Sequence, residues 1–162
     1  GQYIVASGDV ANTTTETTNV SYTIDDFQIN DTINIVIFGG LTNNVGSNQN
    51  CTIRVKMTGV TLAFDFTAIP TSASARSIFG TVTIAGADFL GLLAGAAGRL
   101  NLSGAGSTGA DFGGLARAVL VGSNALTAGD PLAVTLTVQH GSASANLTAR
   151  FAMGVTRARH QP

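Results

Sequence analysis

The chain has 162 residues, of which 10% are charged and 44% hydrophobic, and its formal net charge is −1. A typical soluble domain carries about 25% charged residues, so the predicted surface is neutral and rich in Gly, Ala, Thr, Ser and Asn. A net charge near zero provides no basic field for nucleic acid or an anionic membrane. The single cysteine excludes an internal disulfide.

The first eighteen residues are predicted to form a short strand followed by an extended arm. Residues 3–5 are aromatic or β-branched, as strands favour, whereas residues 7–18 contain almost no large apolar side chain that could anchor them to a core. We expect this arm to become ordered on a partner. The contact residues expected on it are Thr13, Thr14, Thr15 and Glu16. Residues 19–162 are expected to form a single β-sandwich domain.

An acidic cluster follows the second predicted strand, residues 19–24. Asp25, Asp26 and Asp31 supply hard oxygen ligands of the kind that bind calcium. The sequence lacks the D-x-[DN]-x-[DN]-G loop, however, and Asp is also common in turns. A turn is therefore favoured over a calcium site.

Residues 32–38 are predicted to form a strand that is apolar on both faces. Ile33, Ile35 and Ile37 share one face, while Val36 and Phe38 lie on the other. Because the outer face of a two-layer sandwich is normally wet, this second face requires cover from a loop of the same chain or from a partner subunit. Val36 and Phe38 are accordingly candidate interface residues.

A hairpin is predicted in the next part of the chain. Residues 52–57 and 60–66 alternate between apolar and polar side chains, and Thr58 and Gly59 supply a two-residue turn between them. A further strand is expected at 79–84. Residues 88–100 begin with a potential Asp cap and are compatible with one short helix, but their glycines oppose it. A glycine-rich loop is the alternative there.

Motif-like sequences occur in the glycine-rich part of the chain, but none has its required context. Residues 104–109 match G-x-G-x-x-G without the strand and helix that a dinucleotide site needs. Ser107 has no base within predicted reach, because His140 is expected in an exposed loop and His160, close to the last residue, is also expected to be exposed. One Cys and two His form no zinc spacing. No catalytic, metal or cofactor site is therefore predicted.

The C-terminal part holds two strongly alternating segments, 132–139 and 147–153, after a strand at 117–121. The short polar segment 140–144 between them predicts a closing hairpin. Short strands bounded by turn residues, about nine in all, with at most one helix, are typical of an all-β antiparallel sandwich. An eight-stranded jelly roll is the favoured architecture.

The overall character of the chain resembles that of a known family. The features that carry the resemblance are the low charge, the TTTETT segment (13–18) and the strands LAVTLTVQ (132–139) and NLTARFAM (146–153). In these the chain resembles the small jelly-roll decoration proteins on the heads of tailed bacteriophages. The resemblance implies a virion structural protein on the capsid exterior, synthesised in the host cytoplasm, that binds the major capsid protein. It also implies self-association as a trimer or dimer and no enzyme activity. The near-neutral charge predicts no direct contact with nucleic acid or membrane, and the missing motifs predict no cofactor.

Two other classes of function stay open. The first alternative is a carbohydrate-binding or adhesive β-sandwich of a fibre or cell surface, although aromatic platforms for sugars are scarce, with two Tyr and no Trp. The second is an enzyme of another type, against which stands the missing acid–base constellation.

Overall fold

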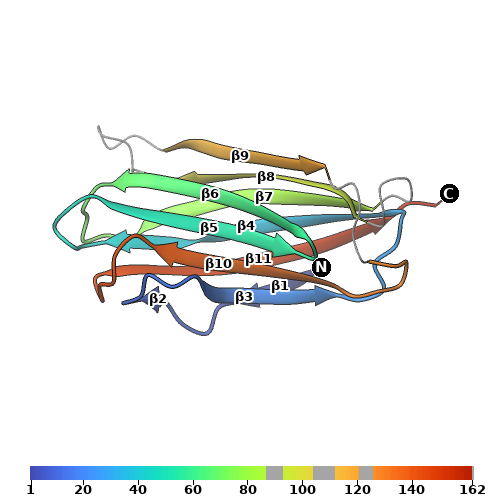
Figure 1. Ribbon diagram of the computed structural model, residues 1–162, viewed down its shortest axis with the longest axis horizontal. Coiled ribbons are helices and arrows are strands. Elements are labelled where there is room, and N and C mark those ends of the chain that lie inside the picture. Colours follow the sequence, from blue (N-terminus) through green and yellow to red (C-terminus); the bar gives the residue numbers. More distant parts are fainter. Residues whose placement is uncertain (87–92, 104–111, 121–125, 162) are drawn as a thin grey trace.

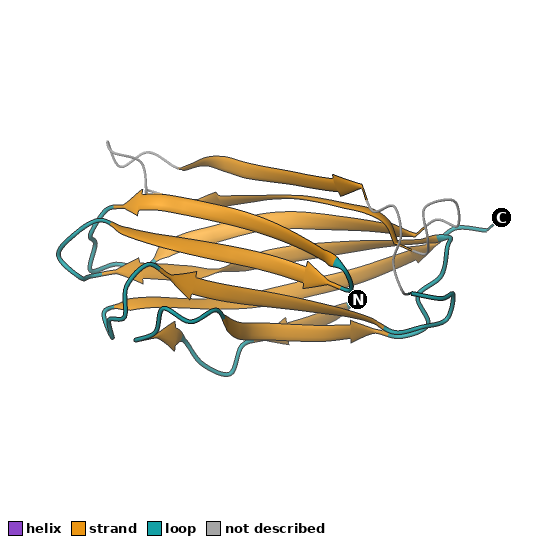
Figure 2. Cartoon of the chain, in the orientation of Figure 1, coloured by secondary structure: helices purple, strands orange, loops and turns teal. Residues whose placement is uncertain are grey.

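In the computed structural model, which describes residues 1–86, 93–103, 112–120 and 126–161, the chain folds into two antiparallel β-sheets packed face to face (Figure 1). The described residues contain no helix (Figure 2), and thus none that could cross a membrane. The predicted all-β antiparallel sandwich is confirmed. The seven-stranded sheet consists of β1 (Gln2–Val5), β2 (Val10–Ala11), β4 (Asp31–Asn43), β7 (Arg76–Gly86), β8 (Leu93–Leu102), β9 (Phe112–Leu120) and β11 (Leu147–Arg159). The four-stranded sheet consists of β3 (Thr17–Ile24), β5 (Gln49–Met57), β6 (Val60–Ile69) and β10 (Leu132–His140).

Alternation along the strands separates a dry interior from an outer face on each sheet. In β4, Ile33, Ile35 and Ile37 are fully buried between the sheets, and the residues between them point outward. Phe64 and Phe66 of β6, which belong to the four-stranded sheet, are also fully buried. This period of two is the pleat of the strand, and burial of each such side chain contributes about 1.5–3 kcal/mol. Of the two apolar faces predicted for this strand, the one with the three isoleucines is therefore buried in the core. The face with Val36 and Phe38 is on the outside of the sandwich.

The strands pair as in one long antiparallel hairpin that is folded over so that successive pairs belong alternately to the two sheets. Its tip is the turn at Thr58 and Gly59 between β5 and β6, which confirms the hairpin predicted there. Outward from this tip, β4 pairs with β7, β3 with β10 and β1 with β11, and these pairs alternate between the sheets. The strands β8 and β9 continue the larger sheet beyond β7, and β2 pairs with β11. Segments from opposite ends of the chain, drawn blue and red in Figure 1, are therefore neighbours.

The predicted hairpin of residues 132–139 and 147–153 is wrong. Both segments are strands, but β10 pairs with β3 and β5 in one sheet, whereas β11 pairs with β1 and β4 in the other. The connection between them crosses from sheet to sheet, and Gly141 N donates to Asn50 O at 2.8 Å on the way. A local alternation specifies a strand but not its partners, and here every partner is distant along the chain.

Most of the segment predicted as a helix or loop over 88–100 belongs to a strand, β8; residues 87–92 lie outside the described part. β8 pairs with β7 along its length. A Cβ built on Gly80 of β7 would lie only 1.9 Å from the carbonyl oxygen of Arg99 in β8. Glycine here permits a close approach of two backbones, one of the reasons for glycine in strand interiors. With β2 and β8, the described residues form eleven strands rather than the predicted eight or nine.

The segment predicted as an arm, residues 7–18, lies against the edge of the sandwich. Val10 is buried and belongs to β2, and its carbonyl oxygen lies 2.9 Å from Nε2 of His140. Gln139 Nε2 donates to the Thr14 carbonyl at 3.1 Å. The segment connects β1 and β3, the edge strands of the two sheets on this side. It is held by the fold rather than projecting from it.

Candidate functional site

Exposed apolar side chains gather on the outer face of the seven-stranded sheet. Among the described residues, five large hydrophobic side chains are exposed, and four of them project from β1, β4 and β7 on this face. Their exposed fractions are 62% for Tyr3, 52% for Val5, 37% for Val36 and 57% for Phe79. The fifth, Ile29, lies in the loop between β3 and β4. The surface formed by Tyr3, Val5, Val36, Phe38 and Phe79, together with the buried Ala152 between Val5 and Phe38, is termed the outer patch.

The register of the sheet makes the outer patch continuous. Val5 is paired with Ala152, Ala152 with Phe38, and Phe38 with Phe79, so one apolar row crosses β1, β11, β4 and β7. The next outward-facing row holds Tyr3, Gly154 and Val36. Opposed Cβ atoms on an antiparallel sheet lie about 4.5–5.5 Å apart. The two rows therefore form one surface and not a scatter of single exposed residues.

Tyr3 and Phe38 stack on each other across β11, with ring centroids 5.4 Å apart and an angle of 23° between the planes. The strand between them carries Ala152 and Gly154 at this point, and these small residues leave room for the rings. A Cβ on Gly154 would meet only Val36 Cβ within 4 Å, at 3.9 Å. Aromatic pairs of this kind stabilise by about 0.5–1.5 kcal/mol beyond their burial. The pair therefore ties the edge strand β1 to the centre of the patch.

Two arginines flank the outer patch, and no acidic side chain does among the described residues of this face. Arg150 lies on β11, two residues before Ala152, and Arg99 lies on β8. Arg150 donates from Nε and Nη2 to the Ala6 carbonyl at 3.2 and 3.0 Å, which directs its guanidinium toward the β1 edge. The other outward-facing residues of β4, β7, β8 and β11 near the patch are small or neutral: Asn34, Gly40, Ser77, Thr81, Thr83, Ala97, Asn101 and Thr156.

The outer face of the four-stranded sheet differs, because its charges are compensated. Glu16 lies 3.1 Å from Lys56 Nζ and 3.7 Å from Arg54 Nη1. The Thr137 hydroxyl donates to Glu16 at 2.8 Å, and this bond, with that from Lys56, lowers the pKa of Glu16. The predicted contact residues 13–16 therefore lie along this face. The structure does not bring them together with Val36 and Phe38, which face the opposite side of the sandwich.

The candidate calcium ligands are engaged by arginines at one end of the sandwich. The buried Asp31 carboxylate accepts a hydrogen bond from Arg159 Nε at 2.7 Å, and Arg159 Nη1 donates to Asp26 at 3.1 Å. Burial raises the pKa of the Asp31 carboxyl, but hydrogen bonds from Arg159 and a backbone amide outweigh it and hold that pKa below its ordinary value. Asp25 accepts from Arg157 through its backbone carbonyl. The described part of the chain holds no group of three or more His, Cys, Asp or Glu suited to a metal.

The prediction that His140 is exposed in a loop is wrong. His140 is buried at the end of β10, where its Nε2 bonds to the Val10 carbonyl and its Nδ1 has no hydrogen-bond partner among the described residues. Burial lowers the pKa of His140, because it disfavours the charged form of the ring. Its register partner on β5 is Cys51, and burial raises the pKa of that thiol to about 12. A protonated, buried thiol of this kind is not a nucleophile.

The remaining residues considered for catalysis are not assembled by the described structure. His160 is exposed, as predicted, and its Nε2 lies 3.2 Å from the Thr32 hydroxyl. Ser107 and the glycine motif at 104–109 lie outside the described residues.

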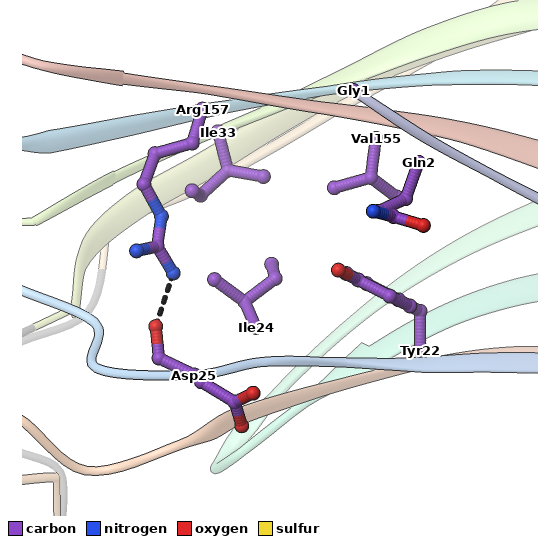
Figure 3. Close-up of a pocket in the computed structure, with 8 residues that line it drawn as sticks. All are labelled: Gly1, Gln2, Tyr22, Ile24, Asp25, Ile33, Val155 and Arg157. Atoms are coloured by element: carbon purple, nitrogen blue, oxygen red, sulfur yellow. Dashed lines mark hydrogen bonds between the residues drawn. The ribbon is translucent and has the colours of Figure 1, made fainter.

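A cavity of about 380 Å³ opens between the sheets near the start of β1 (Figure 3). The side chains of Gln2 and Tyr22 lie on one side of it and Arg157 on the other. Arg157 donates there to the Asp25 carbonyl, drawn as the dashed line, and its Nε lies 3.7 Å from the Asp31 carboxylate. The guanidinium of Arg157, a cation in the lining of this cavity, is thus already bonded to groups of the same chain. The apolar side chains of the outer patch, in contrast, are exposed in the described part of the chain.

No protein-family model matches the sequence, and a search of curated proteins finds no significant match. The candidate site is therefore defined by geometry: an apolar, partly aromatic surface on the seven-stranded sheet, with arginines at its margin.

Proposed function

We propose that this chain is a structural protein of a phage virion that decorates the exterior of the head, and that it binds the major capsid protein through the outer patch. The observation that carries the proposal is the gathering of Tyr3, Val5, Val36 and Phe79 on one face. A contiguous exposed apolar surface marks a contact with another molecule. Aromatic side chains at its centre are the residues that dominate binding in protein interfaces.

The strand order supports the jelly-roll part of the proposal. Without β2, β8 and β9, the chain forms two four-stranded sheets with the orders β1-β11-β4-β7 and β3-β10-β5-β6. A jelly roll is a double sheet of eight strands that contains two Greek keys, and a hairpin rolled up between two sheets gives such pairing. The β8–β9 extension then enlarges the sheet that carries the outer patch.

The chemistry of the surface also supports a lattice-binding role. Small, neutral residues surround the outer patch, and such a margin costs little desolvation when a flat partner covers it. The compensated charges of the opposite face suit a side that stays in water. Self-association as a trimer or dimer belongs to the proposal through the resemblance to decoration proteins.

Replacement of Phe79 by Ser tests the proposal. Because Phe79 is more than half exposed and its main contact is the cross-strand pair with Phe38, Phe79→Ser should lower the free energy of unfolding by only about 1 kcal/mol and leave the protein folded. We expect its affinity for phage heads stripped of the native protein to fall at least about tenfold, measured by co-sedimentation. Ile29→Ser is the matched control, since Ile29 is 44% exposed but lies outside the outer patch, and it should bind like the native protein.

Two outcomes would count against the proposal. Equal binding of Phe79→Ser and the native protein would show that the outer patch is not the contact surface. Failure of the native protein to bind heads, together with selective binding on a glycan array, would favour the carbohydrate-binding alternative.

A further inference from the structure

The two arginines of the outer face occupy opposite corners of the outer patch. Arg99 continues the row of Val36 and Thr81, on the side of β8. Arg150 lies in the row on the other side of Phe38, on β11. A surface that covers the patch therefore meets one guanidinium at each of two corners. The apolar residues lie between them.

These two arginines differ from four other cations of the chain in their electrostatic surroundings. Arg54 and Lys56 pair with Glu16, and Arg157 and Arg159 pair with Asp31. Neither Arg99 nor Arg150 forms an ion pair with any carboxylate in the described ranges. Arginine is the preferred cation for ion pairs at interfaces, because its planar fork matches a carboxylate. The missing negative charge is thus expected from whatever covers the face.

A second copy of the chain does not supply that charge through this face. Face-to-face docking would bring two further arginines and no described acidic side chain. Nucleic acid would supply negative charge, but its phosphates would leave the aromatic centre of the patch without a partner, and the chain has a net charge of −1. A folded protein surface with carboxylates around an apolar centre would contact both the apolar centre of the patch and the two arginines at its corners.

We infer that the outer patch binds a protein surface with an apolar centre and an acidic rim, and that Arg99 and Arg150 pair with carboxylates of that rim. The inference rests on the proposed function and specifies the chemistry of its partner. Complementary charges at the margin of an interface increase the association rate and select the partner. They also make binding sensitive to salt, because exposed charges are screened over about 10 Å at 0.1 M.

The test measures binding of the native protein and four variants to stripped heads at 50 and 300 mM NaCl. We expect the native affinity to fall about tenfold over this range. Arg99→Gln should weaken binding severalfold at low salt and flatten the salt dependence, while Arg99→Lys should largely preserve both. Lys56→Gln is the matched control, because it removes the same charge from the opposite face. Arg150→Gln should act like Arg99→Gln, with circular dichroism verifying the fold because Arg150 also binds the Ala6 carbonyl.

The outcomes separate this inference from the proposed function. If Phe79→Ser abolishes binding but Arg99→Gln and salt have no effect, the inference that the partner has an acidic rim is wrong, whereas the proposed function stands. If the native protein does not bind heads at either salt concentration, both fail. If sedimentation equilibrium instead shows a dimer that Phe79→Ser dissociates and Arg99→Gln strengthens, the occupant is a second copy and the inference is overturned.

Discussion

His140 shows how one buried residue couples the stability of this fold to pH. In the native state its burial lowers its pKa, whereas in the unfolded chain it titrates near its ordinary value of 6.5. Between the ordinary pKa and the lowered native pKa, the unfolded state therefore binds more protons than the native state, and stability falls as the pH falls through this interval. One such group can contribute at most about 1.4 kcal/mol per pH unit. We expect urea unfolding to show this loss between pH 7.5 and 5.5.

The matched variant for this prediction is His140→Gln, which retains an amide donor for the Val10 carbonyl but does not titrate. Its free energy of unfolding should be nearly constant over the same pH range. Glu16 and Asp31 do not interfere, because their pKa values are lowered from ordinary values of 4.5 and 3.8, so their stabilisation is lost only at more acidic pH. An unchanged pH dependence in His140→Gln would assign the effect to another group.

At the scale of elements, the contact of β7 with β8 depends on a residue without a side chain. In Gly80→Ala the new Cβ would lie 1.9 Å from Arg99 O and 2.6 Å from Leu100 Cδ2, so the strands must separate. We expect a loss of about 1–3 kcal/mol of stability in urea unfolding. Gly40→Ala is the control, because its Cβ would meet no atom closer than 3.7 Å. A Gly80→Ala protein as stable as Gly40→Ala would contradict the close approach.

The strands themselves could be predicted from the sequence, because a period of two is a local property of each segment. Every predicted strand has a counterpart in the described structure. Their pairing could not be predicted, as β10 and β11 show, because adjacent strands in a roll enter different sheets. β8 was missed because Gly and Ala replace the β-branched residues that normally identify a strand.

The outer patch was predictable only in part. Val36 and Phe38 could be identified because β4 is apolar on both faces. Phe79 carried a similar signal, a large aromatic residue on the polar face of an alternating strand. Tyr3 and Val5 gave none, because only the register with β11 places them beside Phe38. The positions of Arg99 and Arg150 at the corners of the patch also depend on the strand register, so they could not be predicted from the sequence.

At the scale of the whole molecule, the sequence separation of the paired strands should determine the order in which they pair during folding. β5 and β6 are joined by two residues, whereas β1 and β11 lie at opposite ends of the chain. Closing a longer loop costs more entropy, so pairing should begin at the tip and proceed outward to β1 and β11, which complete the outer patch beside β4 and β7. Folds dominated by such non-local pairs refold in milliseconds to seconds.

A kinetic comparison of the tip with the outermost pair tests this order. Gly59 has a φ of 72° and open space around it, so Gly59→Ala adds only the left-handed strain of about 1 kcal/mol. If the tip forms first, this cost appears as about fivefold slower refolding in stopped-flow circular dichroism, with little change in unfolding. Val155→Ala removes core contacts from β11 and should mainly accelerate unfolding. The reverse pattern would mean that the outermost pair, β1 with β11, forms before the hairpin of β5 and β6.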